Sequence, residues 1–162
     1  MKPPDPARAL QVDVVRAGPD WAPGAADIRA WASAALGRRA AGSELAVRVV
    51  KPAESKRLNA RYRGRDQPTN VLSFPVRALP AASTQRRAPR PLGDLVICAR
   101  VVREEARQQR KTIKAHWAHL VIHGALHLLG YDHEHDAQAR RMERREVAVL
   151  KRFGIANPYR SM

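Results

Sequence analysis

The sequence predicts a single α+β domain, in which a mixed sheet of about four strands packs with about five helices. The length of 162 residues fits one domain that buries a real core without disulfides. Apolar strand patterns alternate with helical patterns in the first two thirds of the chain, and helical patterns dominate the last third. Residues 113–129 are apolar on nearly every side, so we expect this helix to run through the middle of the domain.

The N-terminal half is expected to begin with a mobile tail, residues 1–8, which contain three prolines. The domain itself is expected to span residues 9–162. Apolar periodicity predicts strands at 10–15 and 45–50 and an amphipathic helix at 27–36. A short helix at 52–62 follows, because Pro52 suits a first turn and Gly64 suits a helix end.

The C-terminal half contains two further predicted strands, at 69–75 and 93–98, joined by a long loop. Residues 77–91 of this loop are rich in proline and arginine and contain no acid, which predicts an exposed basic loop. Three helices are expected after the last strand, at 100–109, 113–129 and 136–153. Patterning alone does not fix the order of the strands in the sheet.

The charge of the chain indicates a polyanionic partner. Thirty Lys and Arg against fifteen Asp and Glu give a formal net charge of +15 and a sequence pI near 11.3. Five cations and no acid lie between Lys56 and Arg65, and the arginines of the predicted loop form a second basic stretch. Both stretches are suited to contact a phosphate backbone.

The single cysteine and the lack of long apolar segments indicate the redox chemistry and the cellular compartment of the protein. The single Cys98 lies in an apolar run, so it is expected to be buried and to take no part in a disulfide or a metal site. The N-terminus lacks the apolar centre of a signal peptide, and no apolar stretch approaches membrane length. We therefore expect a cytoplasmic protein without a membrane partner.

The most informative segment runs from His123 to His133 and predicts a metal site with three histidine ligands on the central buried helix. His123 and His127 are four residues apart, which places them on one face of that helix. Gly130 can adopt a left-handed conformation that turns the chain, so that His133 returns to the same ion. Three nitrogen ligands leave one tetrahedral position open, as in catalytic zinc sites, although Ni²⁺ or Co²⁺ would fit the same ligands.

The histidine spacing is that of the extended helix of zinc peptidases, with one difference. Peptidases carry a glutamate, their general base, directly after the first histidine, where this chain has Gly124. The three histidines keep the spacing of metal ligands, but the missing glutamate argues against peptide hydrolysis.

Several polar and charged residues outside the three histidines are candidates for contacts with the metal ligands or the substrate. Asp132 would either orient the ring of His133 or form a turn, and His119 is favoured as a core residue or as one that positions a ligand. Arg63 could pair bidentately with a phosphate or be an ordinary surface arginine. Asn70 and Ser73 offer neutral polar contacts to a substrate, a role less common for such residues than a structural one.

Several motifs in sequence order resemble the bacterial YbeY endoribonucleases. They are the segment 123–133, the preceding Ala-His-Trp-Ala-His at 115–119, Tyr-Arg-Gly-Arg-Asp at 62–66, Pro-Thr-Asn-Val-Leu-Ser-Phe-Pro at 68–75, Gly-Asp-Leu-Val-Ile at 93–97 and Asn-Pro-Tyr at 157–159. The resemblance runs from about residue 58 to the end, whereas the first 57 residues resemble the family only loosely.

The resemblance implies a single-strand-specific, metal-dependent endoribonuclease. Its expected role is the maturation of ribosomal RNA, notably at the 3′ end of the small-subunit RNA, and ribosome quality control. It implies that His123, His127 and His133 bind zinc and that Arg63 is the important arginine of the Tyr-Arg-Gly motif.

Two other classes remain as alternatives. The first is a ribosome-associated RNA-binding module with a structural metal, and the second is a metal-dependent peptidase, which Gly124 disfavours. For the nuclease, either water or the RNA 2′-hydroxyl could be the nucleophile.

Overall fold

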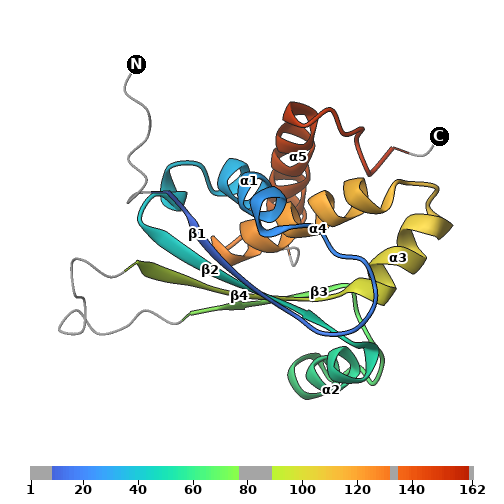
Figure 1. Ribbon diagram of the computed structural model, residues 1–162. Helices are drawn as coiled ribbons and strands as arrows, with labels where there is room; N and C mark the ends of the chain where they lie inside the picture. Colours follow the sequence, from blue (N-terminus) through green and yellow to red (C-terminus); the bar gives the residue numbers. More distant parts are fainter. Residues whose placement is uncertain (1–8, 77–88, 132–134, 161–162) are drawn as a thin grey trace.

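A four-stranded mixed sheet lies at the centre of the computed structural model, which describes residues 9–76, 89–131 and 135–160 (Figure 1). The strand order is β1-β2-β4-β3. The first three of these are parallel, and β3 pairs antiparallel with β4 at one edge. The strands are β1 (Gln11–Arg16), β2 (Ser43–Val50), β3 (Val71–Pro75) and β4 (Arg90–Cys98).

Helices cover both faces of this sheet. Figure 1 shows α1 (Ala25–Leu36), α4 (Ile113–Leu128) and α5 (Asp136–Arg152) on one face and α2 (Pro52–Arg63) on the other. The helix α3 (Ala99–Gln108) follows β4 directly, and a short 3₁₀ helix, η2 (Gly37–Ala40), which was not predicted, extends α1. The predicted α+β class, with its four-stranded mixed sheet and five helices, is confirmed.

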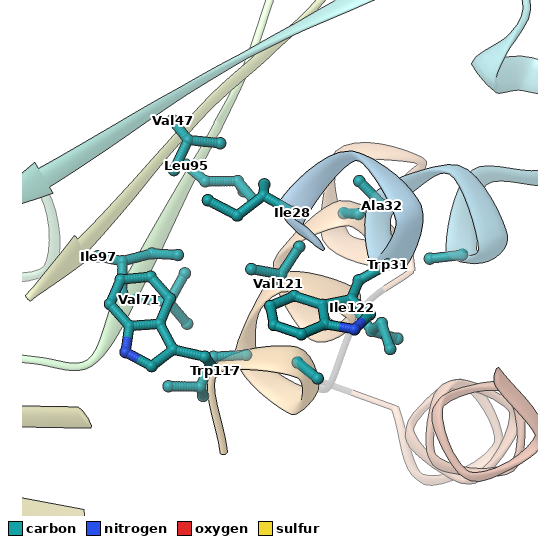
Figure 2. Packing of buried hydrophobic residues seen from close by; sticks show 14 of the residues in the cluster. Ile28, Trp31, Ala32, Val47, Val71, Leu95, Ile97, Trp117, Val121 and Ile122 are labelled. Carbon is teal, nitrogen blue, oxygen red and sulfur yellow. The ribbon is translucent and has the colours of Figure 1, made fainter. Parts of the chain in front are cut away.

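The main core lies between the sheet and α4. Trp117, Val121 and Ile122 of α4 are fully buried, and Figure 2 shows Trp117 below Ile97 of β4, and Val121 and Ile122 near Trp31 of α1. The opposite face of the sheet packs on α2 through a second, smaller cluster, whose buried members are Val50, Leu72, Val96 and Cys98. Residues of both β2 and β4 face both clusters, because successive side chains of a strand point to opposite faces.

The boundaries of β4 correct one prediction. The strand begins at Arg90, so the predicted loop 77–91 is too long at its C-terminal end. Pro91 was predicted to lie in the loop, but the strand accommodates it through a register shift against β2. Gly93 has a φ of 143°, and a Cβ there would lie 2.3 Å from the carbonyl oxygen of Phe74, so only glycine fits. The predicted tail and residues 77–88 of the predicted loop lie outside the described residues.

The central helix α4 has defined ends. Its first turn is capped by the Thr112 side chain, which accepts a hydrogen bond of 3.1 Å from the amide of Ala115. At the other end Gly130 has a φ of 96° and donates a hydrogen bond of 2.9 Å to the carbonyl oxygen of His127. The left-handed turn predicted for Gly130 is therefore present. Within the described ranges, neither α4 nor any other helix is long and apolar enough to cross a membrane.

Candidate metal centre

Four histidines form a row along α4. His116, His119, His123 and His127 follow one another at helical spacing, so their rings lie on one side of the helix. The ring centroids of His119 and His123 are 6.1 Å apart, and those of His123 and His127 are 4.7 Å apart. The sequence spacing thus produces the neighbouring pair of imidazoles, His123 and His127, on which the predicted metal site depends.

A buried carboxylate from α5 meets the middle of this row. Glu146 is fully buried, and its Oε1 is hydrogen-bonded to Nδ1 of His123. Its other oxygen, Oε2, lies 3.3 Å from Nε2 of His119 and accepts a hydrogen bond from the hydroxyl of Tyr159. Glu146 therefore connects α4, α5 and the segment that follows α5.

The hydrogen bonds determine the charge of this cluster. Burial alone would raise the pKa of Glu146, but hydrogen bonds from His119, His123 and Tyr159 and the charge of His123 outweigh burial and lower the pKa to about 2. Burial lowers the pKa of His119, against the opposing effect of Glu146. Burial and the Glu146 carboxylate together raise the pKa of the Tyr159 phenol. At neutral pH Glu146 is therefore an anion, His119 favours its neutral form, and Tyr159 keeps its proton.

Because the carboxylate of Glu146 is ionised, it can only accept a hydrogen bond. The proton between the two groups therefore resides on Nδ1 of His123, so Nε2 is the nitrogen that offers a lone pair in the neutral ring. Histidines that bind metals commonly have this arrangement, in which a carboxylate fixes the tautomer and the orientation of the ring. The contact between Glu146 and His123 thus fits a metal ligand at position 123.

The donor atoms near Glu146 suit a metal ion in more than one combination. Ligand atoms of His119, His123 and Glu146 lie within 4.8 Å of one another. Imidazole nitrogens and a carboxylate oxygen are ordinary zinc ligands. Since Oε1 of Glu146 already accepts from His123, the geometry favours Glu146 as the group that orients this ligand.

Two of the predicted residues, Asp132 and His133, lie outside the described residues. Glu146, by contrast, was not predicted. The sequence did carry a signal for it, because Glu146 occupies a position on the apolar face of α5, four residues after Met142 and three before Val149. An acid on the buried face of a helix needs a partner, and here the partners are histidines.

The two polar residues predicted on β3 are engaged within the protein. Asn70 donates through Nδ2 to the Glu105 carboxylate at 3.0 Å, and its Oδ1 accepts from the amide of Val71 at 2.6 Å. Glu105 also contacts Nε2 of the buried His116 at 2.9 Å. Ser73 donates a hydrogen bond of 3.1 Å to the carbonyl oxygen of Gly124. These bonds tie the edge strand β3 to α3 and α4 beside the histidine row.

Gly124 lies where α4 packs tightly against the sheet. A Cβ at this position would lie 2.8 Å from Cδ2 of Leu95 and 3.2 Å from Oγ of Ser73. Leu95 is fully buried, so it has little room to move aside. The side chain of a glutamate cannot be accommodated here, which gives a packing reason for the missing peptidase base.

Arg63 lies apart from the histidine row. It is the last residue of α2, is exposed, and precedes Gly64, whose φ of 69° ends the helix. Figure 1 shows α2 across the sheet from α4, with the edge strand β3 beside both. Tyr62 packs edge-on against Phe74 of β3 with ring centroids 5.0 Å apart, and this contact fixes the end of α2 relative to that strand.

Comparison with known proteins agrees with this architecture. The family model described as endoribonuclease YbeY matches residues 25–154. A protein of Alkalilimnicola ehrlichii named endoribonuclease YbeY is 54% identical over 158 residues, covering 96% of this chain and 93% of that protein. The solution structure of TM1509 from Thermotoga maritima shares the fold, with a TM-score of 0.54 at 23% identity, and the match covers 94% of this chain and 96% of that one. The chain therefore belongs to the YbeY endoribonuclease family.

Proposed function

We propose that this protein is a single-strand-specific, metal-dependent endoribonuclease that acts in the cytoplasm on ribosomal RNA. Its substrate would be the 3′ end of the small-subunit RNA, on the ribosome or its precursors, with a further role in ribosome quality control. Membership of the YbeY family supports the activity, and the net charge of +15 supports a polyanionic substrate. The observation that carries the proposal is the hydrogen bond between Nδ1 of His123 and the buried carboxylate of Glu146.

We assign the metal to His123, His127 and His133, with zinc as the favoured ion. When bound, zinc would supply Lewis acidity, which polarises a phosphoryl oxygen and lowers the pKa of water toward about 7. Glu146 holds a proton on Nδ1 of His123 and thereby presents Nε2 as the coordinating atom. Tyr159 donates to the other oxygen of Glu146, so the carboxylate is held from two sides.

Arg63 would contribute through the substrate. A guanidinium is always charged at neutral pH and can donate two parallel hydrogen bonds to a phosphate. Arg63 is exposed at the end of α2, in a stretch with four other cations, where a strand of RNA can reach it. Its role would be to hold a phosphate of the strand and to stabilise charge that develops there during cleavage.

The test compares zinc-loaded wild-type protein with His127→Ala and, as a matched control, with His135→Ala. His135 is an exposed histidine at the start of α5 and is not among the assigned ligands. Each protein is incubated with single-stranded RNA, with duplex RNA and with casein, and its zinc content is measured. We expect the wild type and His135→Ala to cut only single-stranded RNA, and His127→Ala to lose both zinc and cleavage.

Equal cleavage by the wild type and His127→Ala would contradict the proposal. Binding of RNA without any cleavage by zinc-loaded protein would favour an RNA-binding module instead. The ends of the products identify the nucleophile: a 2′,3′-cyclic phosphate indicates the 2′-hydroxyl, and a 5′-phosphate with a 3′-hydroxyl indicates water.

A further inference from the structure

A cavity of about 730 Å³ adjoins His119 in the histidine row. It lies between the turn that joins α3 to α4 and the segment after α5, residues 154–160. Its walls include His119 and Tyr159, the two residues that share Oε2 of Glu146. A cavity of this size suits a ligand as large as a nucleotide.

The lining of this cavity is cationic. It contains Arg110, Lys111 and Arg160 and no acidic residue. Throughout the described part of the chain, none of these three side chains takes part in an ion pair with an acid. Burial lowers the pKa of Lys111, partly offset by the Glu105 carboxylate, so this ammonium is partly removed from water. Such a cluster favours an anionic ligand.

Arg110 has an unusual backbone conformation. Its φ is 55°, and it is the one described residue other than glycine with a positive φ. Glycine adopts this conformation without strain, whereas an arginine does so at a cost. The turn thus holds a cation at a position where glycine would be more stable.

Tyr159 offers an aromatic surface on the wall of the cavity. Its hydroxyl is fixed by Glu146, and its ring stands edge-on to that of His119, with centroids 5.5 Å apart and an interplanar angle of 87°. The residue is nevertheless 42% exposed. A ring that is anchored at one end and accessible at the other is suited to stack with a nucleobase.

We propose that this cavity binds one nucleotide of the RNA strand, with its base against Tyr159 and its phosphate beside Arg110 and Lys111. The proposal rests on the function proposed above and adds a subsite to it. His119 precedes His123 by one helical turn, about 6 Å along the axis, which is comparable to the length of one nucleotide. The bound nucleotide would therefore be a near neighbour of the one cleaved at His123 and His127.

The test measures the binding of RNA to the full chain after removal of metal with a chelator, so that cleavage does not interfere. The probe is a fluorescent oligouridylate of about ten nucleotides, followed by anisotropy. The double variant Arg110→Gly/Lys111→Ala removes two cations from the cavity. The control Arg29→Ala/Arg38→Ala removes two exposed arginines that do not line this cavity.

We expect the cavity variant to bind about tenfold more weakly and its slope of log K against log salt to fall by about 0.7, the value for one lost phosphate contact on a single strand. The control should weaken binding by less than about threefold, since screening limits distant charges. Because Arg110→Gly relieves an unfavourable conformation, this single variant should melt no lower than the wild type, which separates lost binding from misfolding.

Two variants of Tyr159 test the stacking. Tyr159→Phe keeps the ring but loses the hydroxyl that anchors it to Glu146, so it should bind the oligouridylate up to about threefold more weakly than the wild type, whereas Tyr159→Leu should bind about tenfold more weakly. Wild-type affinity in both the double variant and Tyr159→Leu, or no measurable binding by the wild type, would overturn the subsite. If the variants lose affinity as expected while zinc-loaded wild type cuts no RNA, the subsite stands and the proposed nuclease function fails.

Discussion

Glu146 on α5 accepts a hydrogen bond from Nδ1 of His123 on α4, and this contact joins the two residues across 23 positions of the chain. The acid is fully buried, but its pKa is lowered to about 2 by its partners, so it remains charged at neutral pH. A fixed negative charge beside one imidazole nitrogen makes the opposite nitrogen a better ligand for a metal ion.

Replacing Glu146 with glutamine should therefore weaken metal binding without removing a ligand. We expect the zinc affinity of Glu146→Gln to fall by about 10–100-fold, the usual effect of removing a carboxylate that orients a histidine ligand. Competition with a chromogenic chelator measures this affinity. Glu143→Gln, one turn earlier on α5, is the matched control and should bind zinc like the wild type. Complete loss of zinc would instead make Glu146 a direct ligand, and unchanged affinity would remove it from the metal site.

A second buried network gives a pH dependence to folding. Burial would raise the pKa of Glu105, but hydrogen bonds from His116 and Asn70 outweigh it, so the pKa lies below its ordinary value of 4.5. A group whose pKa is lower in the folded state stabilises the fold above its unfolded pKa, and this contribution is lost as pH falls through the folded value.

We therefore expect the free energy of unfolding of the wild type to exceed that of Glu105→Gln near neutral pH. The difference should shrink between about pH 5 and about pH 3, and urea unfolding at a series of pH values measures it. Glu104→Gln, the exposed neighbour on α3, should differ little from the wild type throughout. A difference that stays constant across this range would show that the charge of Glu105 does not matter.

The packing at Gly124 predicts the result of restoring the peptidase glutamate. Gly124→Glu places a large charged side chain against Leu95 and Ser73, where a Cβ alone is already too close. We expect the free energy of unfolding to fall by more than about 3 kcal/mol and no casein hydrolysis to appear. Ala30→Glu, an exposed position on α1, controls for the added charge and should change stability by less than about 0.5 kcal/mol.

Much of this architecture was predictable because its signals are local. The all-round apolar pattern of α4 identified the buried helix, and Gly130 identified the turn that ends it. The start of β4 was predicted too late, because Pro91 lies inside the strand, where a register shift against β2 accommodates it. That compensation depends on the neighbouring strand and is not visible in β4 itself.

The candidate site was only partly predictable, because some of its contacts join segments that are distant in the sequence. The spacing of His123 and His127 is a property of one helix, so their ring contact followed from sequence. Glu146 reaches them from another helix, and its importance depends on how α5 packs against α4. The engagement of Asn70 with Glu105, 35 residues away, is likewise a product of tertiary structure.

A substitution of Arg63 should affect the cleavage rate without affecting stability, because this residue is exposed at the end of α2. The described contacts of that helix end involve its neighbours Tyr62 and Gly64. Arg63→Lys keeps the charge but loses the planar fork that holds a phosphate through two hydrogen bonds. If Arg63 stabilises charge developing on the phosphate, the single-turnover rate on single-stranded RNA should fall by about 100-fold or more. The free energy of unfolding should stay within about 0.5 kcal/mol of the wild type.

Arg65→Lys, two residues further in the same basic stretch, should leave the rate nearly unchanged, since it keeps the charge that contributes to general attraction of RNA. Equal rates for Arg63→Lys and the wild type would show that position 63 supplies only charge, and equal losses for both variants would assign the effect to the basic stretch as a whole.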